Sequence, residues 1–296
     1  MNILRALVNK IPFYRRLKNF FQYPPGHYYS PIPSLREVKS NDERIFNNIP
    51  RDIPGVDLNV GVQLRLFDDL TKWYHTLPFK EQKTNRLRYY YENIFYSYSD
   101  AIMLFCMIRH LRPKRIIEIG SGFSSCVMLD VNELFFDNTI SCTFIEPYPD
   151  RLHSLITPED RKRANILQQR IQDVAPELFA SLEENDILFI DSSHVSKIDS
   201  DVNHLLFNIL PALAPGVYVH FHDIIYPFEY SRTWVYEGLF WNEAYILRAF
   251  LQYNTTFKIV MFNSYLAQFY REKLQNNMPL CLKNTGGSLW LKKMHQ

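Results

Sequence analysis

Residues 115–125 read RIIEIGSGFSS, and this stretch is the strongest indication of the fold. Its first five residues are predicted to form a short strand. Two of the chain's nine glycines, Gly120 and Gly122, follow at once. Glycine lets the backbone turn sharply and approach a ligand without a Cβ in the way, and a helix opening at Ser124 presents unpaired amides. The stretch therefore predicts a strand, a glycine turn beside a ligand and a helix.

Downstream of this turn, short apolar runs alternate with helical stretches. Such alternation is typical of βαβ units, which build a parallel sheet covered by helices on both faces. The sequence thus predicts an α/β domain. The expected strands are 115–119, 141–145, 165–169, 186–190, 216–222, 257–262 and 288–292. The expected helices are 124–135, 149–155, 174–182, 197–210 and 234–252, with an insertion containing some helix at 263–287.

The preceding part of the chain has a different character. We expect an N-terminal helical extension over residues 1–100 and the α/β domain over residues 101–296, with helices at 61–75 and 99–111. Within the extension, residues 23–33 (YPPGHYYSPIP) contain four prolines. Prolines at this density exclude regular helix and central strand, so this segment is expected to be a stiff, extended loop.

The first 36 residues carry basic side chains and no acid, with apolar residues at a helical period. A basic amphipathic helix can lie on an anionic membrane surface or dock on its own domain. Pro12 interrupts the apolar stripe and shortens any helix lying on a membrane. Docking is therefore the favoured interpretation, and membrane contact by residues 1–22 is the alternative.

Composition sets limits on class and compartment. The chain has 296 residues, 47% of them hydrophobic, and a formal net charge of +2. It is long enough for a large globular core, and its charge gives no reason to expect nucleic acid as a partner. No apolar run approaches about 18 residues and no signal-peptide pattern is visible, so a cytoplasmic location is expected. The four cysteines are widely spaced without a CxxC pair, which favours reduced packing residues.

One carboxylate stands at the end of each of the first five expected strands. These carboxylates are Glu118, Glu146, Asp173, Asp191 and Asp223. Open α/β sheets bind ligands at the carboxyl ends of their strands, and an acid after the second strand can accept the hydroxyls of a ribose. A glycine turn alone is weak evidence, because several cofactor classes use one. An acid in front of the turn, however, repels a pyrophosphate and suits a cationic ligand bearing an amino group.

The run IIEIGSGFSS, with Glu146, Asp173 and Asp191 at later strand ends, resembles the class I S-adenosylmethionine-dependent methyltransferases. The resemblance covers residues 102–292, about two thirds of the chain. It implies a Rossmann-like methyltransferase fold with a mostly parallel seven-stranded sheet and helices on both faces. The cofactor it implies is S-adenosyl-L-methionine. Ser124 departs from the pattern, since many members have a third glycine there.

The same resemblance assigns residues to the cofactor. It implies that Glu118, Gly120, Ser121 and Gly122 hold the methionine end. It implies that Glu146 binds the ribose hydroxyls and that Asp173 accepts a hydrogen bond from the adenine amino group. Gln172 is expected near the adenine ring, and Asp191 is expected to contact the methionine part if no metal is present.

A second group of residues follows the fourth and fifth strands, as Asp191-Ser-Ser-His194 and His220-Phe-His222-Asp223. These strand ends are neighbours in a right-handed parallel sheet. Two carboxylates and an imidazole suit a divalent ion such as Mg or Fe, so Asp191, His222 and Asp223 are candidate metal ligands. His194 is the candidate base, because an unperturbed pKa near 6.5 suits proton removal at neutral pH.

This arrangement is similar to the macrocin O-methyltransferase and cephalosporin hydroxylase-like branch. That branch has DxxH after the fourth strand and an acidic pair after the fifth, around a divalent metal. Here His222 stands where the first acid of the pair is expected, which removes one negative charge and weakens the case for magnesium. Without a metal, His220 is a core residue and Asp223 caps the following turn.

The resemblance implies transfer of a methyl group to the hydroxyl oxygen of a small molecule, such as a sugar or glycosylated product. His194, Asp191 and Asp223 are the expected catalytic residues. One alternative is a hydroxylase of the same fold in which Asp191, His222 and Asp223 hold ferrous iron. Another is a protein that binds S-adenosylmethionine without catalysis. A homo-oligomer is compatible with the sequence.

Overall fold

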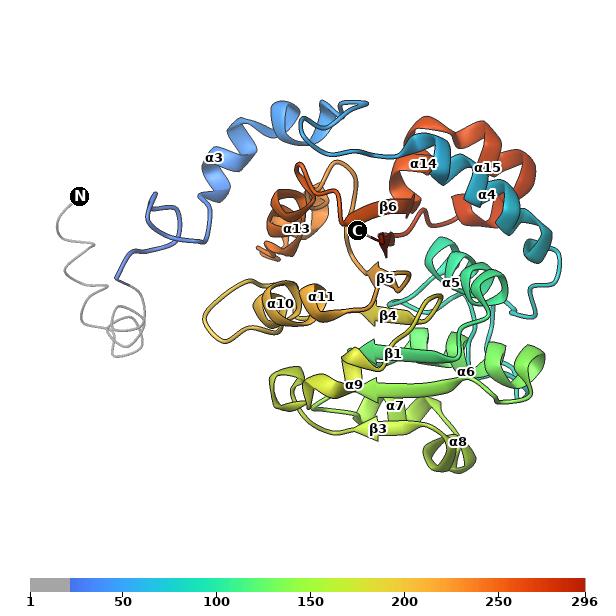
Figure 1. The fold of residues 1–296 in the computed structure, drawn as a ribbon. Coiled ribbons are helices and arrows are strands. Elements are labelled where there is room, and N and C mark those ends of the chain that lie inside the picture. The colour runs from blue at the N-terminus through green and yellow to red at the C-terminus, as the bar shows by residue number, and fades with distance from the viewer. Residues whose placement is uncertain (1–21, 296) are drawn as a thin grey trace. The chain divides into compact units, whose positions relative to one another are not determined.

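The computed structural model describes residues 22–295, and within them the strands form a seven-stranded sheet (Figure 1). The strand order is β3-β2-β1-β4-β5-β7-β6. Neighbours among β1 to β5 run parallel, and β7 runs antiparallel to both β5 and β6. The strands are β1 (Arg115–Ile119), β2 (Ser141–Ile145), β3 (Asn165–Leu167), β4 (Ile187–Ile190), β5 (Tyr218–Phe221), β6 (Phe257–Phe262) and β7 (Leu289–Lys293). The Rossmann-like, mostly parallel sheet expected from the sequence is confirmed.

The register of the central strands aligns their carboxyl ends. Ile119 of β1 lies opposite Ile145 of β2 and Ile190 of β4, and Ile190 lies opposite Phe221 of β5. The ladder continues one step further, since Asp191 N donates to Ile119 O at 2.8 Å. The residues that follow these strands therefore emerge side by side at one edge of the sheet.

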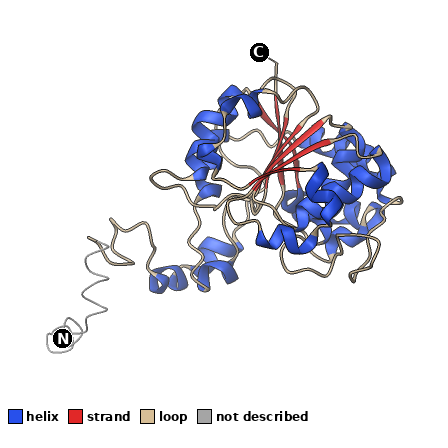
Figure 2. Cartoon of the chain, turned by 90° about the horizontal axis from the view of Figure 1, so that it is seen from below, coloured by secondary structure: helices blue, strands red, loops and turns tan. Residues whose placement is uncertain are grey.

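Helices lie on both sides of this sheet (Figure 2). One of them, α5 (Tyr98–Leu111), is buried at every position except Arg109 and His110, as expected for a helix that is apolar on nearly all sides. The other α-helices packed in this unit are α4 (Val60–Tyr74), α6 (Phe123–Phe136), α7 (Asp150–Leu155), α8 (Pro158–Arg163), α9 (Pro176–Ala180), α10 (Asp201–His204), α11 (Leu210–Ala212), α13 (Glu243–Leu251), α14 (Asn263–Phe269) and α15 (Arg271–Asn277). The shorter elements are η2 (Ile171–Asp173), η3 (Leu205–Ile209) and η4 (Pro279–Leu282).

Contacts group the described residues into two compact units. The unit with the sheet comprises residues 50–230 and 241–295, and it includes α4. The other comprises residues 22–49 and 231–240. It holds α3 (Leu35–Ser40), η1 (Glu43–Asn47) and α12 (Arg232–Tyr236), and Arg232 pairs there with Asp42 at 2.7 Å. The boundary expected at residue 100 stays a prediction.

Residues 23–33 form neither helix nor strand, as their prolines predict. The amphipathic pattern of the first 21 residues lies outside the described part, so the choice between docking and membrane contact stays open. Within residues 22–295, no helix combines the length and apolar character needed to cross a bilayer. All four cysteines are buried with free thiols, as their spacing suggested.

Two helix predictions need correction. The single helix expected over 234–252 is divided into α12 and α13, and Gly238 between them has a φ of +91°, a left-handed conformation that ends helices. The helix expected from residue 197 begins only at Asp201, where the Ser200 side chain accepts from Asn203 N and caps it. Residues 197–200, which were expected to be helical, form a loop before α10.

Candidate active site

A cavity of about 480 Å³ opens at the carboxyl ends of β1, β2 and β4. That volume lies in the range of small-molecule and cofactor sites. Four of the residues predicted to bind cofactor line it, namely Gly120, Glu146, Gln172 and Asp191. The structure thus brings together residues that are up to 71 positions apart in the sequence, because the strand register places them at one edge.

The glycine turn is packed against the end of β4. Gly120 has a φ of +76°, and a Cβ built on it would lie 2.0 Å from the backbone oxygen of Asp191. No side chain fits in that space, which gives a physical reason for glycine here. Gly122 differs, since its φ of 177° is ordinary extended backbone and a Cβ there would meet only Arg151 Cδ at 3.5 Å.

Glu118 lies beneath the turn and not on the cavity wall. Its carboxyl group is fully buried and accepts hydrogen bonds from the Ser124 and Ser125 hydroxyls. Burial raises the pKa of Glu118 to about 8. Glu118 therefore braces the start of α6. Ser121 and Gly122 do not line the cavity either, so the predicted contacts of these three residues with a methionine moiety remain untested.

Glu146 is held at the cavity wall by two backbone amides. Its carboxylate accepts from Tyr148 N at 2.8 Å and from Ser121 N at 3.3 Å. These bonds tie the end of β2 to the glycine turn and orient the carboxylate without using a cationic side chain. A carboxylate so placed retains acceptor capacity for the hydroxyls of a ribose.

Of the two residues expected near the adenine, Gln172 and Asp173, only Gln172 lines the cavity. Gln172 lines the cavity, and its Nε2 donates to Asp199 O at 2.7 Å. Asp173 does not line the cavity, and its carboxylate pairs with Arg170 Nε at 3.0 Å. Arg170 also reaches Asp199 at 3.2 Å, so this pair closes one wall of the cavity.

His194 stands among three carboxylates next to the cavity. Its Nε2 lies 3.4 Å from Asp191 Oδ1 and 3.7 Å from Asp223 Oδ2, and its Nδ1 lies 2.8 Å from Glu243 Oε2. The structure thus brings His194, Asp191 and Asp223 together, and their catalytic role stays a prediction. Glu243 was not predicted, because no motif connects it with residues about 50 positions earlier.

The protonation state of His194 differs from the expectation of an unperturbed imidazole. Burial by itself lowers the pKa of His194, but the Asp191 and Glu243 carboxylates outweigh burial and raise it to about 10. The ring is therefore an imidazolium at neutral pH. It must lose a proton before it can act as a base, so the assumption of a pKa near 6.5 is corrected.

The residues proposed as metal ligands do not form a metal site. Among residues 22–295, no group of three or more His, Cys, Asp or Glu side chains is arranged to hold an ion. His194 Nε2 lies near both of the proposed carboxylate ligands, Asp191 and Asp223. His222 lies 3.5 Å from Asp223 Oδ1, and its ring packs against Tyr96. The arrangement of these side chains in the described part of the chain thus does not fit a divalent ion.

Backbone conformation marks the same two strand ends. His194 has a φ of +60° and Asp223 a φ of +56°. Left-handed conformations are uncommon outside glycine and persist only where surrounding structure enforces them, which often happens at functional sites. The surrounding structure therefore fixes the backbone at both strand ends.

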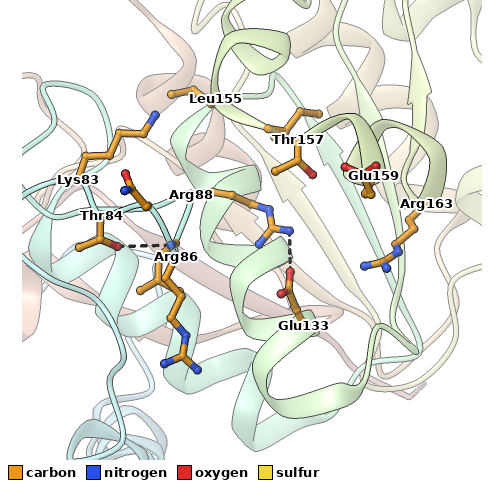
Figure 3. A pocket seen from close by; sticks show the side chains of 12 residues that line it. Lys83, Thr84, Arg86, Arg88, Glu133, Leu155, Thr157, Glu159 and Arg163 are labelled. Carbon is orange, nitrogen blue, oxygen red and sulfur yellow. Dashed lines mark hydrogen bonds and ion pairs between the residues drawn. The ribbon is translucent and has the colours of Figure 1, made fainter.

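A second hollow, of about 460 Å³, lies between residues 83–88, α6 and α8 (Figure 3). Arg88 forms ion pairs there with Asp130 at 2.8 Å, Asp160 at 2.6 Å and Glu133 at 2.6 Å. None of the predicted site residues lines this hollow. Its carboxylates compensate the guanidinium, so we interpret the group as a structural anchor between the 83–88 segment and the two helices.

Comparison with known proteins agrees with this placement of the site. Residues 117–224 match the family model of a methyltransferase domain. An uncharacterized protein of Archaeoglobus fulgidus is 39% identical over 169 residues, which are 56% of this chain and 76% of that protein.

Two solved structures are similar to the chain at low identity. The SAH-bound methyltransferase of Podospora anserina is 13% identical with a TM-score of 0.43, and the match covers 88% of this chain and 95% of that one. The O-methyltransferase TomG of Streptomyces achromogenes, in complex with SAM, is 12% identical with a TM-score of 0.45, covering 88% and 96%. Residues 117–224 thus match a methyltransferase domain model, and the chain belongs to the same family as the archaeal protein.

Proposed function

We propose that this protein is an S-adenosylmethionine-dependent O-methyltransferase that acts on a hydroxyl group of a small molecule, such as a sugar or glycosylated product. The observation that carries the proposal is the position of Gly120, Glu146 and Asp191 around one cavity, directly beside the His194 cluster. The methyltransferase domain match over the same segment supports it. We further propose a cytoplasmic enzyme whose partner is the acceptor and not nucleic acid.

The cavity supports a cationic cofactor. Glu146 is oriented by Ser121 and Tyr148 to accept ribose hydroxyls, and Gln172 lies on the wall where the adenine ring is expected. At the other end, Asp191 also lines the cavity, and the pKa of its carboxyl is lowered because His222 and His194 outweigh its burial. A carboxylate that stays ionised favours the positive charge of an S-adenosylmethionine methionine moiety.

Methylation of an alcohol requires loss of the hydroxyl proton as its oxygen attacks the methyl carbon of the sulfonium. We assign proton removal to His194 in its neutral form, with its Nε2 as the accepting atom. Asp191 and Asp223 flank that atom and stabilise the imidazolium that results. The methyl group leaves the sulfonium as S-adenosylhomocysteine forms, and the proton finally passes to solvent.

The test is product formation from S-adenosylmethionine labelled in its methyl group, incubated with a panel of hydroxylated acceptors. Label in an O-methyl product together with S-adenosylhomocysteine supports the proposal. Binding of S-adenosylhomocysteine without transfer to any acceptor would favour the non-catalytic alternative. Hydroxylation that depends on iron and oxygen would favour the hydroxylase alternative, which the described residues do not support.

A further inference from the structure

Backbone amides at the start of α13 form hydrogen bonds with the backbone of His194. Asn242 N and Glu243 N donate to His194 O at 3.0 and 3.1 Å. Asn242 also bonds to the next part of the loop, since its Oδ1 accepts from Ser196 N at 2.6 Å. The loop after β4 is therefore fixed by the helix and does not depend on β4 alone for its position.

The Glu243 side chain makes a second connection to the same loop. Its Oε2 faces His194 Nδ1 at 2.8 Å, and its Oε1 accepts from the Ser192 hydroxyl at 2.9 Å. Ser192 Oγ in turn accepts from His194 N at 3.0 Å. Glu243, Ser192 and His194 thus form a closed ring of hydrogen bonds.

Burial makes this contact energetically important. Glu243 is 1% exposed and His194 is 6% exposed. A buried carboxylate is costly unless it is paired and hydrogen-bonded, and the imidazole with the Ser192 hydroxyl meets that need. Truncating Glu243 would leave the imidazole without its partner and free to turn or to change tautomer.

The geometry of the ring leaves one nitrogen for chemistry. With Nδ1–H donating to Glu243, only Nε2 remains on the side of Asp191 and Asp223. The indole ring of Trp241 packs against the imidazole with centroids 4.5 Å apart, which restricts rotation of the imidazole. In a neutral ring this arrangement keeps the proton on Nδ1 and the lone pair on Nε2.

We propose that Glu243 is a positioning residue, which holds the proton on His194 Nδ1 and directs Nε2 toward the methyl acceptor. The inference rests on the proposed function, because it assigns Nε2 as the atom that accepts the proton. The alternative is a buried pair that only stabilises the fold.

The proposal is tested with protein labelled with ¹⁵N in its histidine rings. Wild type should show a hydrogen-bonded Nδ1–H resonance for His194, assigned through its loss in His194→Asn. Glu243→Ala should lose this resonance. Glu243→Gln, whose amide oxygen can still accept from Nδ1–H, should retain it in weakened form. Tyr245→Phe, on the same helix but bonded to Glu229, is the matched control and should leave it unchanged.

Turnover provides the second readout. Glu243→Ala removes a carboxylate that raises the pKa of His194, so kcat is compared on its high-pH plateau, where the ring is neutral in both proteins. There Glu243→Ala should lower kcat by roughly 10- to 100-fold, with partial rescue in Glu243→Gln. The KM for S-adenosylmethionine should stay the same. If Glu243→Ala fails to fold, Glu243→Gln, which has nearly the same shape, supplies the measurement. Wild-type kcat in Glu243→Ala, or an unchanged His194 resonance, would overturn the positioning role.

Binding of S-adenosylhomocysteine to wild type separates the two claims. If wild type does not bind it, the proposed function fails, whatever the His194 resonance shows. If wild type binds it and turns over, while Glu243→Ala keeps both the resonance and the rate, only the inference about Glu243 fails.

Discussion

The backbone oxygen of Asp191 occupies the space that a side chain on Gly120 would need, 2.0 Å from the position of a Cβ. The turn after β1 and the end of β4 therefore close on each other directly. This contact sets the distance between the glycine turn and Asp191, both of which line the cavity. The cavity thus depends on backbone packing as much as on its side chains.

Gly120→Ala should destabilise the fold and abolish cofactor binding together. The strained left-handed φ alone costs about 1–3 kcal/mol, and the clash with Asp191 adds to it. Gly122→Ala is the matched control, since its backbone is extended and its Cβ position is open. Urea denaturation and calorimetry with S-adenosylhomocysteine measure both effects. Equal stability of the two variants would contradict the packing described above.

Glu146→Ala should weaken S-adenosylhomocysteine binding by about 1–3 kcal/mol, the cost of losing hydrogen bonds to a charged acceptor. Asp173→Ala should have a smaller effect, because Asp173 pairs with Arg170 and does not line the cavity. Calorimetric titration of both variants gives the comparison. A larger loss in Asp173→Ala would mean that the two residues have been given the wrong roles.

The rate of methyl transfer should rise with pH. The pKa of His194 is raised to about 10, and only the neutral ring can accept the proton. The fraction of molecules with a neutral His194 therefore increases about tenfold per pH unit from neutrality until the pH approaches that value. Initial rates between pH 6 and about 10, at saturating cofactor, test this. A rate that levels off near pH 7 would show that the base is another group or that bound cofactor lowers the pKa of His194.

His194→Ala should keep its affinity for S-adenosylhomocysteine and lose roughly 10²- to 10⁴-fold in turnover. The loss should stay nearly constant below about pH 10, because the neutral fraction of His194 and the hydroxide concentration rise together, and it should shrink only above the pKa of His194. Parallel measurement of Kd and kcat separates binding from chemistry. Unchanged turnover would remove His194 from proton transfer.

Arg88→Ala should destabilise the fold by about 3–5 kcal/mol, because it leaves the buried Asp130 and Asp160 unpaired. Burial opposes ionisation of Asp160, but bonds from Arg88 and Thr157 outweigh it and lower its pKa. That stabilisation is present above the unfolded pKa of an aspartate, near 3.9, and is lost as pH falls through the folded value. The difference in free energy of unfolding between wild type and Arg88→Ala should therefore become smaller at low pH.

Urea denaturation of wild type and Arg88→Ala at neutral and acid pH measures this change in the stability difference. Lys114→Ala, which removes an exposed pair with Glu183, is the control and should cost less than about 1 kcal/mol. If Arg88→Ala were no more harmful than Lys114→Ala, the anchor would not contribute to stability.

Features that depend on neighbouring residues could be predicted from the sequence, whereas features that depend on contacts between distant residues could not. The strands β1, β2 and β6 are where local apolar runs place them, and Glu146 and Asp191 could be assigned because each directly follows a strand. Glu243 could not be found this way, since it meets His194 only through tertiary folding after the break at Gly238. The raised pKa of His194 was missed for the same reason, because Glu243 contributes to it.

Calorimetric titration of the wild-type protein with S-adenosylhomocysteine, and separately with NAD, tests the central claim most directly. The cavity beside Gly120, Glu146 and Asp191 should bind S-adenosylhomocysteine at a single site, and Glu146→Ala should weaken that binding. Binding of NAD with no heat from S-adenosylhomocysteine would contradict the account.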